Sequence, residues 1–473
     1  MERTLIADII GKEGEEVTLK GWVDVRRDHG KLIFIDLRDR SGAVQIVFIP
    51  SDKELLAKAG TLRSEWVIAL TGKVQKRPEN MVNANSPTGA YEILATGLEV
   101  LNEATTPPIE VSGNDGMAIG EEVRLANRYI DLRRTRMQKN IRNRHKVISA
   151  IRKFFDKNHF VEVETPILTK STPEGARDYL VPARLYPGHF YALPQSPQQY
   201  KQLLMASGLE RYYQIARCFR DEDTRGDRQP EFTQLDLEMS FVKREDVMAV
   251  NEEVLIELVK TLYPHKKIQE IPFPQMSYKE AMEKYGNDRP DLRTDKNDPN
   301  LLAFCWVIDF PFFEKTDNGG LPAQSGWTFT HNPFSAPKPE DMENLMNKTN
   351  LGDILTTQYD VALNGSEIGG GSIRNHQPEA LKKVFEIMGF EEERIQANFG
   401  HMLRALGSGC PPHGGIAWGL DRLLCILENE PNIREVIAFP KTGDGRDPMM
   451  QSPSPVAPDQ LAELSIKISE NKK

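Results

Sequence analysis

The sequence predicts an α+β protein in two folded parts, a small β-barrel at the N-terminus and a larger α+β unit after it. The first part, residues 1–104, alternates apolar and polar side chains at the period of a β-strand. A segment rich in Pro and Gly, Thr105 to Gly120, then opens a hinge that we expect over residues 105–140. The remainder, residues 141–473, mixes strand and helix patterns, and a chain of 473 residues is long enough for two or three cores.

Five short strands are predicted in the first part, with one helix between the third and the fourth. We expect the strands at residues 17–23, 32–37, 44–48, 66–70 and 91–94, and the helix at residues 52–59. This order suggests an OB-fold barrel, a fold that binds oligonucleotides or oligosaccharides. On the second strand Phe34 faces away from Ile33 and Ile35, so only one of these faces can be core. A core role for Phe34 and a base-stacking role both stay open at this point.

The chain is acidic overall, with a net charge of -9, but one stretch is strongly basic. From Arg124 to Lys153 there are eleven Lys and Arg residues and a single acid, Asp131. An isolated run of this kind is ordinarily the solvated face of a helix. It could instead serve RNA phosphates or subunit contacts, and phosphate binding would make RNA affinity depend on salt.

A predicted hairpin over residues 213–241 carries the strongest chemical signal. Its first strand ends at Arg220, and a charged loop over residues 221–228 leads to a second strand that begins at Phe232. Because successive side chains of a strand point to opposite faces, one face of this second strand carries Gln234, Asp236 and Glu238. Arg220 offers a planar fork of donors to a phosphate, and Phe232 offers a flat ring to a base. The hairpin is therefore typical of a nucleotide-binding platform.

Two cations outside the hairpin suggest an anionic substrate. Lys201 lies one turn into a predicted helix for which Ser196 is the expected N-cap, and Arg374 follows the glycine run 369–371. Two cations that point into a pocket are costly to bury unless an anion pairs with them. The side-chain carboxylate of aspartate satisfies both cations. A lysine substrate would need acidic residues instead, and asparagine would forgo two charge-assisted bonds.

A turn signal brings two acidic residues together. Asn364-Gly365 favours a two-residue hairpin turn. Such a turn pairs Ala362 with Glu367 and puts Asp360 and Glu367 on the same face of the hairpin.

Three segments together resemble the sequence motifs of the class II aminoacyl-tRNA synthetases, in the form found in bacterial aspartyl-tRNA synthetases. Phe160 to Pro166 is similar to motif 1, residues 213–241 to motif 2, and Gly415 to Leu423, continuing to about residue 427, to motif 3. The resemblance runs from about Thr4 to about Val456.

The resemblance implies a fold, a reaction and partners. The second part would be a class II catalytic domain built on an antiparallel sheet with flanking helices, and the barrel would bind the anticodon. The enzyme would use ATP and Mg²⁺ to attach L-aspartate to tRNA-Asp through an aspartyl-adenylate. A homodimer formed across motif 1 is expected.

The family's functional residues can be placed on this sequence. Arg220, Glu367 and Arg422 would act in catalysis. Aspartate would be bound by Glu174, Gln198, Lys201, Arg220, Asp236, His331 and Arg374. ATP would be bound by Arg220, Asp221, Glu222, Gln229, Phe232, Glu367, Gly419, Leu420, Asp421 and Arg422. Asp360 and Glu367 would hold magnesium, and the anticodon would contact Arg26, His29, Phe34, Gln45, Arg77 and Asn83.

Three positions depart from the bacterial pattern. The bacterial enzymes carry a large inserted domain between motifs 2 and 3, where this chain has only the bridge Thr294 to Asn300. Asn332 stands where relatives often have a second His. His29 stands where enzymes strict for tRNA-Asp tend to have Leu, and several enzymes that also charge tRNA-Asn have His there. Charging of tRNA-Asn as a second acceptor and a neutral substitution at His29 both stay open at this point.

Composition restricts the remaining possibilities. The four cysteines form no Cys-x-x-Cys pair, no apolar run approaches the roughly 20 residues of a membrane helix, and the first residues lack a signal-peptide layout. We expect a cytoplasmic protein that does not enter a membrane. The alternatives are a non-catalytic RNA-binding paralogue, an ATP-dependent ligase that forms asparagine, and an asparaginyl-tRNA synthetase.

Overall fold

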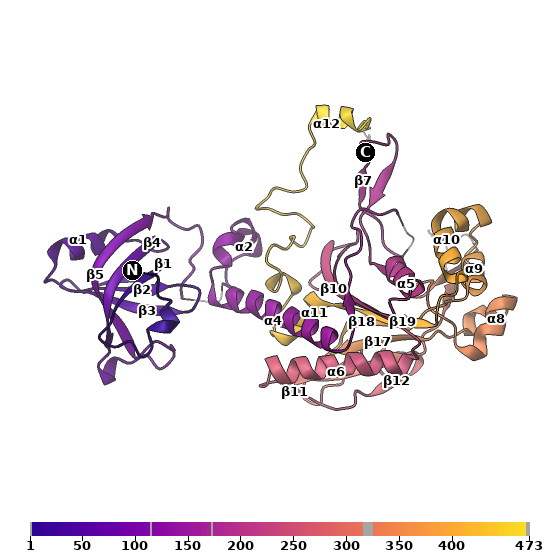
Figure 1. Cartoon of the computed structure of the whole chain (residues 1–473), viewed down its shortest axis with the longest axis horizontal. Helices are drawn as coiled ribbons and strands as arrows, with labels where there is room; N and C mark the ends of the chain where they lie inside the picture. Colours follow the sequence, from indigo (N-terminus) through magenta and orange to yellow (C-terminus); the bar gives the residue numbers. More distant parts are fainter. Residues whose placement is uncertain (1, 114–115, 172–173, 316–324, 470–473) are drawn as a thin grey trace. The chain divides into compact units, whose positions relative to one another are not determined.

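The computed structural model describes residues 2–113, 116–171, 174–315 and 325–469. It divides into two compact units, Met1–Arg136 and Met137–Lys473, each with its own core. Figure 1 shows the first unit in indigo and violet and the second in the remaining colours.

The first unit contains a closed barrel of five strands in the order β1-β2-β3-β5-β4, with β4 pairing back to β1. The strands are β1 (Glu16–Asp28), β2 (Ile33–Arg38), β3 (Ala43–Phe48), β4 (Val67–Lys76) and β5 (Tyr91–Asn102). Helix α1 (Lys53–Thr61) lies between β3 and β4, and Asp52 caps it by accepting the backbone N–H of Leu55. The predicted OB-fold barrel is confirmed. Its strands run longer than the alternating pattern indicated, because β-bulges let β1, β4 and β5 continue past a change of register.

Alternation along β2 sorts core from surface in the barrel. Ile33, Ile35 and Leu37 are buried, whereas Phe34 and Asp36 between them are only half-buried. Phe34 therefore lies on the outer face, which excludes the core role among its two open interpretations.

Two short helices, α2 (Glu121–Ala126) and α3 (Arg128–Asp131), complete the first unit. Asp131 is fully buried there and lies within 3.4 Å of guanidinium nitrogens of Arg124, Arg128 and Arg134. These three arginines belong to the basic stretch of the sequence, yet they face a buried carboxylate. The first part of that stretch is therefore not a solvated helix face.

The second unit is organised by an eight-stranded sheet in the order β12-β14-β17-β18-β19-β10-β9-β6. All neighbours are antiparallel except the two edge pairs, β12 with β14 and β6 with β9. The strands are β6 (Val161–Glu162), β9 (Arg211–Phe219), β10 (Glu231–Ser240), β12 (Gln275–Ser277), β14 (Phe304–Ile308), β17 (Gln358–Leu363), β18 (Ser366–Ile373) and β19 (His413–Gly419). The predicted hairpin over residues 213–241 is formed by β9 and β10.

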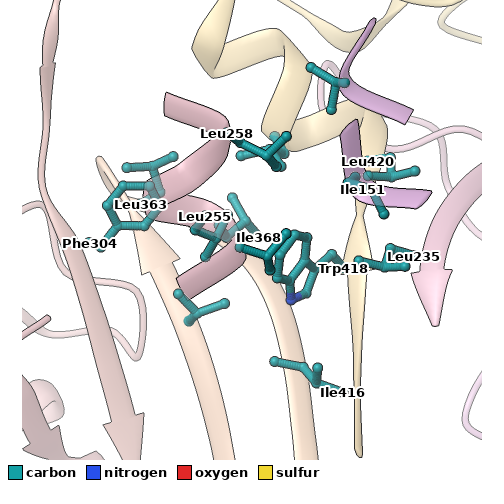
Figure 2. Close-up of a cluster of buried hydrophobic side chains, with 14 of the residues drawn as sticks. Ile151, Leu235, Leu255, Leu258, Phe304, Leu363, Ile368, Ile416, Trp418 and Leu420 are labelled. Carbon is teal, nitrogen blue, oxygen red and sulfur yellow. The ribbon is translucent and has the colours of Figure 1, made fainter. Parts of the chain in front are cut away.

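One face of this sheet is apolar and is covered by three helices, α4 (Thr135–Lys157), α6 (Arg244–Leu262) and α11 (Leu420–Leu427). Figure 2 shows this core, where Trp418 and Leu235 of the sheet lie among Ile151 of α4 and Leu255 of α6. Fully burying an aliphatic side chain stabilises the fold by about 1.5–3 kcal/mol. The opposite face carries polar side chains at alternate positions, so the pleat itself separates the core from the candidate site.

The remaining elements flank the sheet. The helices are α5 (Gln198–Ala206), α7 (Tyr278–Tyr285), α8 (Met342–Asn347), α9 (Pro378–Ile387), α10 (Glu392–Gly407) and α12 (Pro458–Glu463). The small strand pairs are β7 (Leu180–Pro182) with β8 (Phe190–Ala192), β11 (Lys267–Ile268) with β13 (Leu301–Leu302), and β15 (Phe313–Lys315) with β16 (Trp327–Phe329). No helix in the described ranges is long and apolar enough to cross a membrane.

Candidate active site

A cavity of about 200 Å³ opens on the polar side of the sheet, between the β9–β10 hairpin, β18 and the β19–α11 turn. Eight residues that the sequence analysis placed at ATP line it: Arg220, Glu222, Gln229, Phe232, Glu367, Gly419, Asp421 and Arg422. The guanidinium carbon of Arg220 lies 5.1 Å from the centroid of the Phe232 ring, close enough for a cation–π contact. The structure thus brings most of the predicted nucleotide residues into one cavity.

The carboxylate of Asp421 is fully engaged by the protein. Its Oδ1 accepts a hydrogen bond from Arg144 at 2.5 Å, and its Oδ2 accepts the backbone N–H of Thr233 at 2.9 Å. The neighbouring Leu420 side chain is buried in the core of Figure 2. Both residues were predicted to contact ATP, but Leu420 can do so only through its backbone.

The other predicted ATP residues differ in how much of each side chain remains available. Gln229 accepts the backbone N–H of Lys441 at 2.7 Å through Oε1, and its Nε2 donates only a long hydrogen bond of 3.5 Å to the Arg228 carbonyl. Glu222 accepts a long hydrogen bond of 3.4 Å from Arg228. Asp221 pairs with Arg177 at 3.6 Å on the surface and does not line the cavity.

Arg422 joins the two walls of the cavity. Its Nη1 donates to the backbone carbonyl of Glu367 on β18, and its Nη2 lies 3.3 Å from Asp227 in the motif 2 loop. The Arg422 guanidinium therefore lies at the cavity between β18 and the β9–β10 loop, where a triphosphate or a base could contact it.

A fully buried cluster of four charges lies beside this cavity. Lys201 donates to Asp236 at 2.7 Å and lies 3.3 Å from Glu238, and Arg374 grips Glu238 through Nε at 2.8 Å and Nη2 at 3.1 Å. Each of the four side chains is at most 3 % exposed. The sequence analysis expected Lys201 and Arg374 to need a substrate anion. That was wrong for the protein without ligand, because Asp236 and Glu238 already balance them.

The pKa values of the two carboxyl groups in this cluster shift in opposite directions. Burial raises the pKa of Asp236, despite the ammonium of Lys201 beside it. Burial also opposes ionisation of Glu238, but Arg374 and Lys201 outweigh it and hold the pKa of Glu238 below its usual range. Glu238 is therefore the firm counter-ion of Arg374, whereas Asp236 is the carboxylate that a second cation would stabilise.

Sequence reasoning noted Glu238 on the polar face but did not assign it a role in the site. The signal that could have found it is the period-two row of polar side chains on β10 together with Gly415 on the neighbouring strand. A Cβ atom at Gly415 would lie 2.1 Å from Glu238 Oε2, so only glycine leaves room for that carboxylate. The glycine run has a similar cause, since a Cβ at Gly370 would lie 2.6 Å from Asp360 Oδ1 and one at Gly371 would lie 2.1 Å from the Gly415 carbonyl.

Several buried polar atoms near the cluster have no hydrogen-bond partner among the described residues. They include Nε2 of Gln198 at the start of α5 and Oδ2 of Asp236, and the amide nitrogens of Gln199 and Gln202 on the same helix are also without a partner. An amide donor and a carboxylate acceptor are the groups that an amino acid's carboxylate and ammonium would satisfy. Glu174 lies close to the start of α5 and accepts the Ser196 hydroxyl at 2.7 Å. Ser196 was expected to be the N-cap of this helix, but Pro197 occupies that position.

His331 lies against Phe310, with ring centroids 4.5 Å apart. Burial lowers the pKa of His331, although Glu367 and Asp288 oppose the shift, so the neutral imidazole is favoured. Asn332 closes a turn, since its Oδ1 accepts the backbone N–H of Phe334 at 3.0 Å, and its Nδ2 donates at 3.5 Å to Gln358, which donates to Asp360.

The predicted turn before Glu367 is confirmed. Asn364 and Gly365 both have positive φ, 52° and 84°, and Ala362 pairs with Glu367. Burial, and then the charge of Glu367, raise the pKa of Asp360 well above its usual range. Two carboxylates that repel each other in this way suit a divalent cation. The described residues hold no cluster of three or more His, Cys, Asp or Glu, so Mg²⁺ here would take its other ligands from water and phosphate, as it commonly does.

A second polar surface lies on the outer face of the barrel. Arg27 grips Asp36 through two hydrogen bonds of 2.7 and 2.8 Å, and Gln45 donates to Glu92 at 3.0 Å. Arg77 lies 3.7 Å from the same Glu92 carboxylate. Gln45 and Arg77 were predicted to contact the anticodon, whereas Asp36 and Glu92 were not considered. Their outward position on predicted strands is the signal that could have found them.

The other predicted anticodon residues divide into two groups. Phe34 and His29 form an edge-to-face pair on the outer face of the barrel, with centroids 5.5 Å apart. Arg26 instead donates to the Gly60 carbonyl at 2.8 Å, and Asn83 accepts the N–H of Asn85 within its own turn. The outer face of the barrel therefore presents Phe34, His29, Gln45 and Arg77. Arg26 and Asn83 are instead bonded to nearby backbone groups.

Comparison with known proteins agrees with both units. Residues 120–443 match the family model described as tRNA synthetases class II (D, K and N), and residues 17–101 match the OB-fold nucleic acid binding domain. The chain is 41% identical over 578 residues to the aspartate–tRNA(Asp/Asn) ligase of Rubrobacter xylanophilus, covering 96% of this chain and 95% of the relative. It is 41% identical over 596 residues to the ligase of the same name from Halothermothrix orenii, covering 99% of each.

Solved structures of low identity share the fold. The asparaginyl-tRNA synthetase of Pyrococcus horikoshii, complexed with asparaginyl-adenylate, has a TM-score of 0.74 at 23% identity and covers 93% of this chain and 98% of its own. A putative aspartyl-tRNA synthetase from Leishmania major has a TM-score of 0.73 at 18% identity, covering 93% of this chain and 94% of its own.

The curated relatives are longer than this chain. Their alignments span 578 and 596 positions, although this chain has 473 residues, so more than 100 positions of each relative have no counterpart. The residues of the bridge are hydrogen-bonded. Thr294 donates its backbone N–H and its hydroxyl to Gln269, and the backbone N–H of Asn300 donates to the Asp298 carboxylate. The chain belongs to the class II aminoacyl-tRNA synthetases, in the bacterial aspartate–tRNA ligase family.

Proposed function

We propose that the protein joins L-aspartate to tRNA-Asp, with tRNA-Asn as a second acceptor, in two steps at the site described above. The observation that carries the proposal is the buried four-charge cluster beside the nucleotide cavity. This cluster supplies two cations that can bind a side-chain carboxylate and carboxylates that can bind an ammonium. It lies within reach of a cavity that suits ATP.

Substrate binding would redistribute the contacts within this cluster. The side-chain carboxylate of aspartate would bind Lys201 and Arg374, and the substrate ammonium would bind Asp236 and Glu174. Lys201 would then exchange part of its contact with Asp236 for the substrate. Asparagine would bring an amide N–H₂ group against these cations, which supports aspartate over asparagine.

The first chemical step needs no protein nucleophile. The α-carboxylate oxygen of aspartate attacks the α-phosphorus of ATP, the bond to the β-phosphate oxygen breaks, and pyrophosphate leaves as aspartyl-adenylate forms. Arg220 would stabilise the charge that develops on the α-phosphate, and Arg422 the charge on the departing pyrophosphate. Asp360 and Glu367 would hold Mg²⁺, which neutralises phosphate charge when bound.

The second step transfers the aspartyl group to the tRNA. The terminal ribose hydroxyl attacks the activated carbonyl carbon, an ester forms, and AMP leaves with the electrons of the broken bond. Residues 1–104 would bind the anticodon, residues 105–140 would act as a hinge, and residues 141–473 would carry the chemistry. Scattered free cysteines suit a reducing cytoplasm as the place of reaction.

We also propose a homodimer. Strand β6 at the edge of the eight-stranded sheet supports it, because both of its residues are exposed and an edge strand presents unpaired backbone groups. Light scattering at micromolar concentration tests this proposal, and a monomeric mass would refute it.

Aspartate-dependent exchange of labelled pyrophosphate into ATP tests the first step. The wild-type chain should catalyse exchange with aspartate and not with asparagine. Arg220→Ala should abolish exchange while the far-UV circular dichroism spectrum stays unchanged, because Arg220 is only half-buried and lies outside the core. Exchange retained by Arg220→Ala would remove this residue from the mechanism, and exchange that depends on asparagine would refute the proposed substrate.

A further inference from the structure

Asp421 connects two elements of the candidate ATP site that are far apart in sequence. It is the second residue of α11, and its Oδ2 accepts the backbone N–H of Thr233 on β10 at 2.9 Å. The ladder between β10 and β19 begins only at Gln234, which pairs with Gly419. Thr233 lies one residue before that ladder, where β19 has already turned into the helix. The Asp421 carboxylate therefore takes the place of a strand partner for this N–H.

The residues adjacent to this hydrogen bond belong to the nucleotide cavity. Phe232 immediately precedes Thr233, and Arg422 immediately follows Asp421. Both line the nucleotide cavity. A hydrogen bond between Thr233 and Asp421 consequently sets the separation of the two backbones from which the ring and the guanidinium project. If this bond lengthened, Phe232 and Arg422 would move apart within the cavity.

Arg144 on α4 holds the other oxygen of the same carboxylate. Its Nη1 lies 2.5 Å from Asp421 Oδ1 and 3.2 Å from the Val436 carbonyl. Asp421 is 3 % exposed, and the Arg144 side chain is 16 % exposed. A buried carboxylate without this cation would lose a charge-assisted bond, and its orientation toward Thr233 would no longer be held from both sides.

We propose that Arg144 and Asp421 are a positioning pair that fixes the separation of Phe232 and Arg422 in the nucleotide cavity. The inference rests on the proposed function for the identity of the nucleotide, but it concerns ATP binding alone. It also gives Arg144 a role other than RNA contact or subunit contact, the two functional possibilities that its place in the basic stretch suggested. The pair acts on the nucleotide through Phe232 and Arg422 and does not itself touch the reacting atoms.

The test compares Arg144→Met with a matched control on the same helix. Asn143 also ties α4 to α11, but it donates at 2.9 Å to Glu428 at the far end of that helix. Asn143→Ala should therefore loosen the contact between the same two helices without moving Phe232 or Arg422. Isothermal titration of each folded variant with ATP and Mg²⁺ measures the affinity, and exchange kinetics separate the KM for ATP from the KM for aspartate.

We expect Arg144→Met to raise the Kd and the KM for ATP about tenfold, the loss that one charge-assisted hydrogen bond represents. The KM for aspartate should change less than about twofold, because the four-charge cluster does not involve α4. Arg144→Lys should recover most of the affinity, since an ammonium can still donate to Asp421. Asn143→Ala should bind ATP as the wild type does.

Three results would overturn the proposal. One is unchanged ATP affinity in Arg144→Met. Another is an equal loss of ATP affinity in Asn143→Ala, which would mean a general loosening of α11. A third is a parallel rise of both KM values. If Arg144→Met does not fold, Arg144→Lys and Asp421→Asn take its place, and unaltered ATP affinity in both would have the same meaning. Calorimetry with ATP needs neither aspartate nor tRNA, so failure of the proposed amino-acid specificity would leave this test intact.

Discussion

The two polar networks of this protein use the same residue types in opposite surroundings. In the catalytic unit, Lys201, Asp236, Glu238 and Arg374 are at most 3 % exposed. On the barrel, the Arg27–Asp36 pair is bidentate but 40 % and 28 % exposed. A buried network can respond strongly to a single charge, because water does not screen it. An exposed network binds a large solvated ligand through many weak contacts. The difference suggests that one site selects a small amino acid and the other selects a polymer.

The largest expected effect is therefore in the buried network. Arg374→Leu removes one partner of a buried ion pair and leaves Glu238 with Lys201 alone. We expect loss of about 3–5 kcal/mol of stability and no measurable aspartate-dependent exchange. Chemical denaturation and the exchange assay measure the two effects. Exchange at a tenth of the wild-type rate or better would contradict the assigned role of Arg374.

Glu238→Gln should be less severe because it preserves shape and keeps a hydrogen-bond acceptor for Arg374. Removing the counter-ion leaves the two cations less balanced, so they should bind the substrate carboxylate in a changed position. We expect the KM for aspartate to change about tenfold while the KM for ATP stays within about twofold. Equal changes in both constants would show that Glu238 acts on the whole unit and not on the amino-acid pocket.

In the barrel, Phe34→Ala should act on tRNA alone. Removing an exposed ring from the outer face forfeits stacking on one base, about 1–3 kcal/mol, so the KM for tRNA-Asp should rise about tenfold or more. Aspartate-dependent exchange needs no tRNA and should be unaffected. Ile46→Val on the neighbouring strand, at a fully buried core position, is a control for barrel stability. Lost exchange in Phe34→Ala would contradict the separation of the two sites.

The effect of salt on ligand binding should also differ between the two networks, by a smaller amount. Raising the salt concentration from about 50 to 200 mM should weaken tRNA binding, because phosphate contacts release counter-ions. Over the same range the KM for aspartate should hardly change, since the buried cluster is shielded from mobile ions. Filter binding and exchange kinetics provide the two measurements. A KM for aspartate that rises in step with the Kd for tRNA would mean that the cluster is more open than the structure indicates.

The smallest expected effect concerns the choice between acceptors. His29 packs edge-to-face on Phe34, so it can influence how a base stacks there. We expect His29→Leu to lower charging of tRNA-Asn relative to tRNA-Asp by a few-fold while leaving tRNA-Asp charging intact. Equal charging ratios in the variant and the wild type would make His29 a neutral difference.

Much of the fold followed from local pattern, because strand alternation and turn chemistry act over a few residues. The barrel strands, the β9–β10 hairpin and the Asn364-Gly365 turn were all predictable in this way. Strand ends in the barrel were not, because bulges and pairing with distant strands extend them. Phe34 could be placed only once the buried face of β2 was known.

The site was less predictable because its chemistry depends on partners distant in sequence. Lys201 and Arg374 were correctly singled out as unusual cations, but their counter-ions lie 35 and 136 residues away, respectively. Arg144 belonged to a basic run that suggested RNA, yet it bonds Asp421, 277 residues further along the chain. A run of charged residues in the sequence gives only the number of charges that the fold must accommodate. Burial in the folded protein determines which of those charges are already paired.

The most direct test of the account is charging of purified tRNA-Asp and tRNA-Asn transcripts with labelled aspartate, ATP and Mg²⁺. We predict that the protein charges both transcripts with aspartate, with tRNA-Asp as the better acceptor. Charging of tRNA-Asp alone would remove tRNA-Asn from the proposal and leave an aspartate-specific enzyme. Failure to charge either transcript with aspartate, or charging of tRNA-Asn with asparagine, would contradict the central claim.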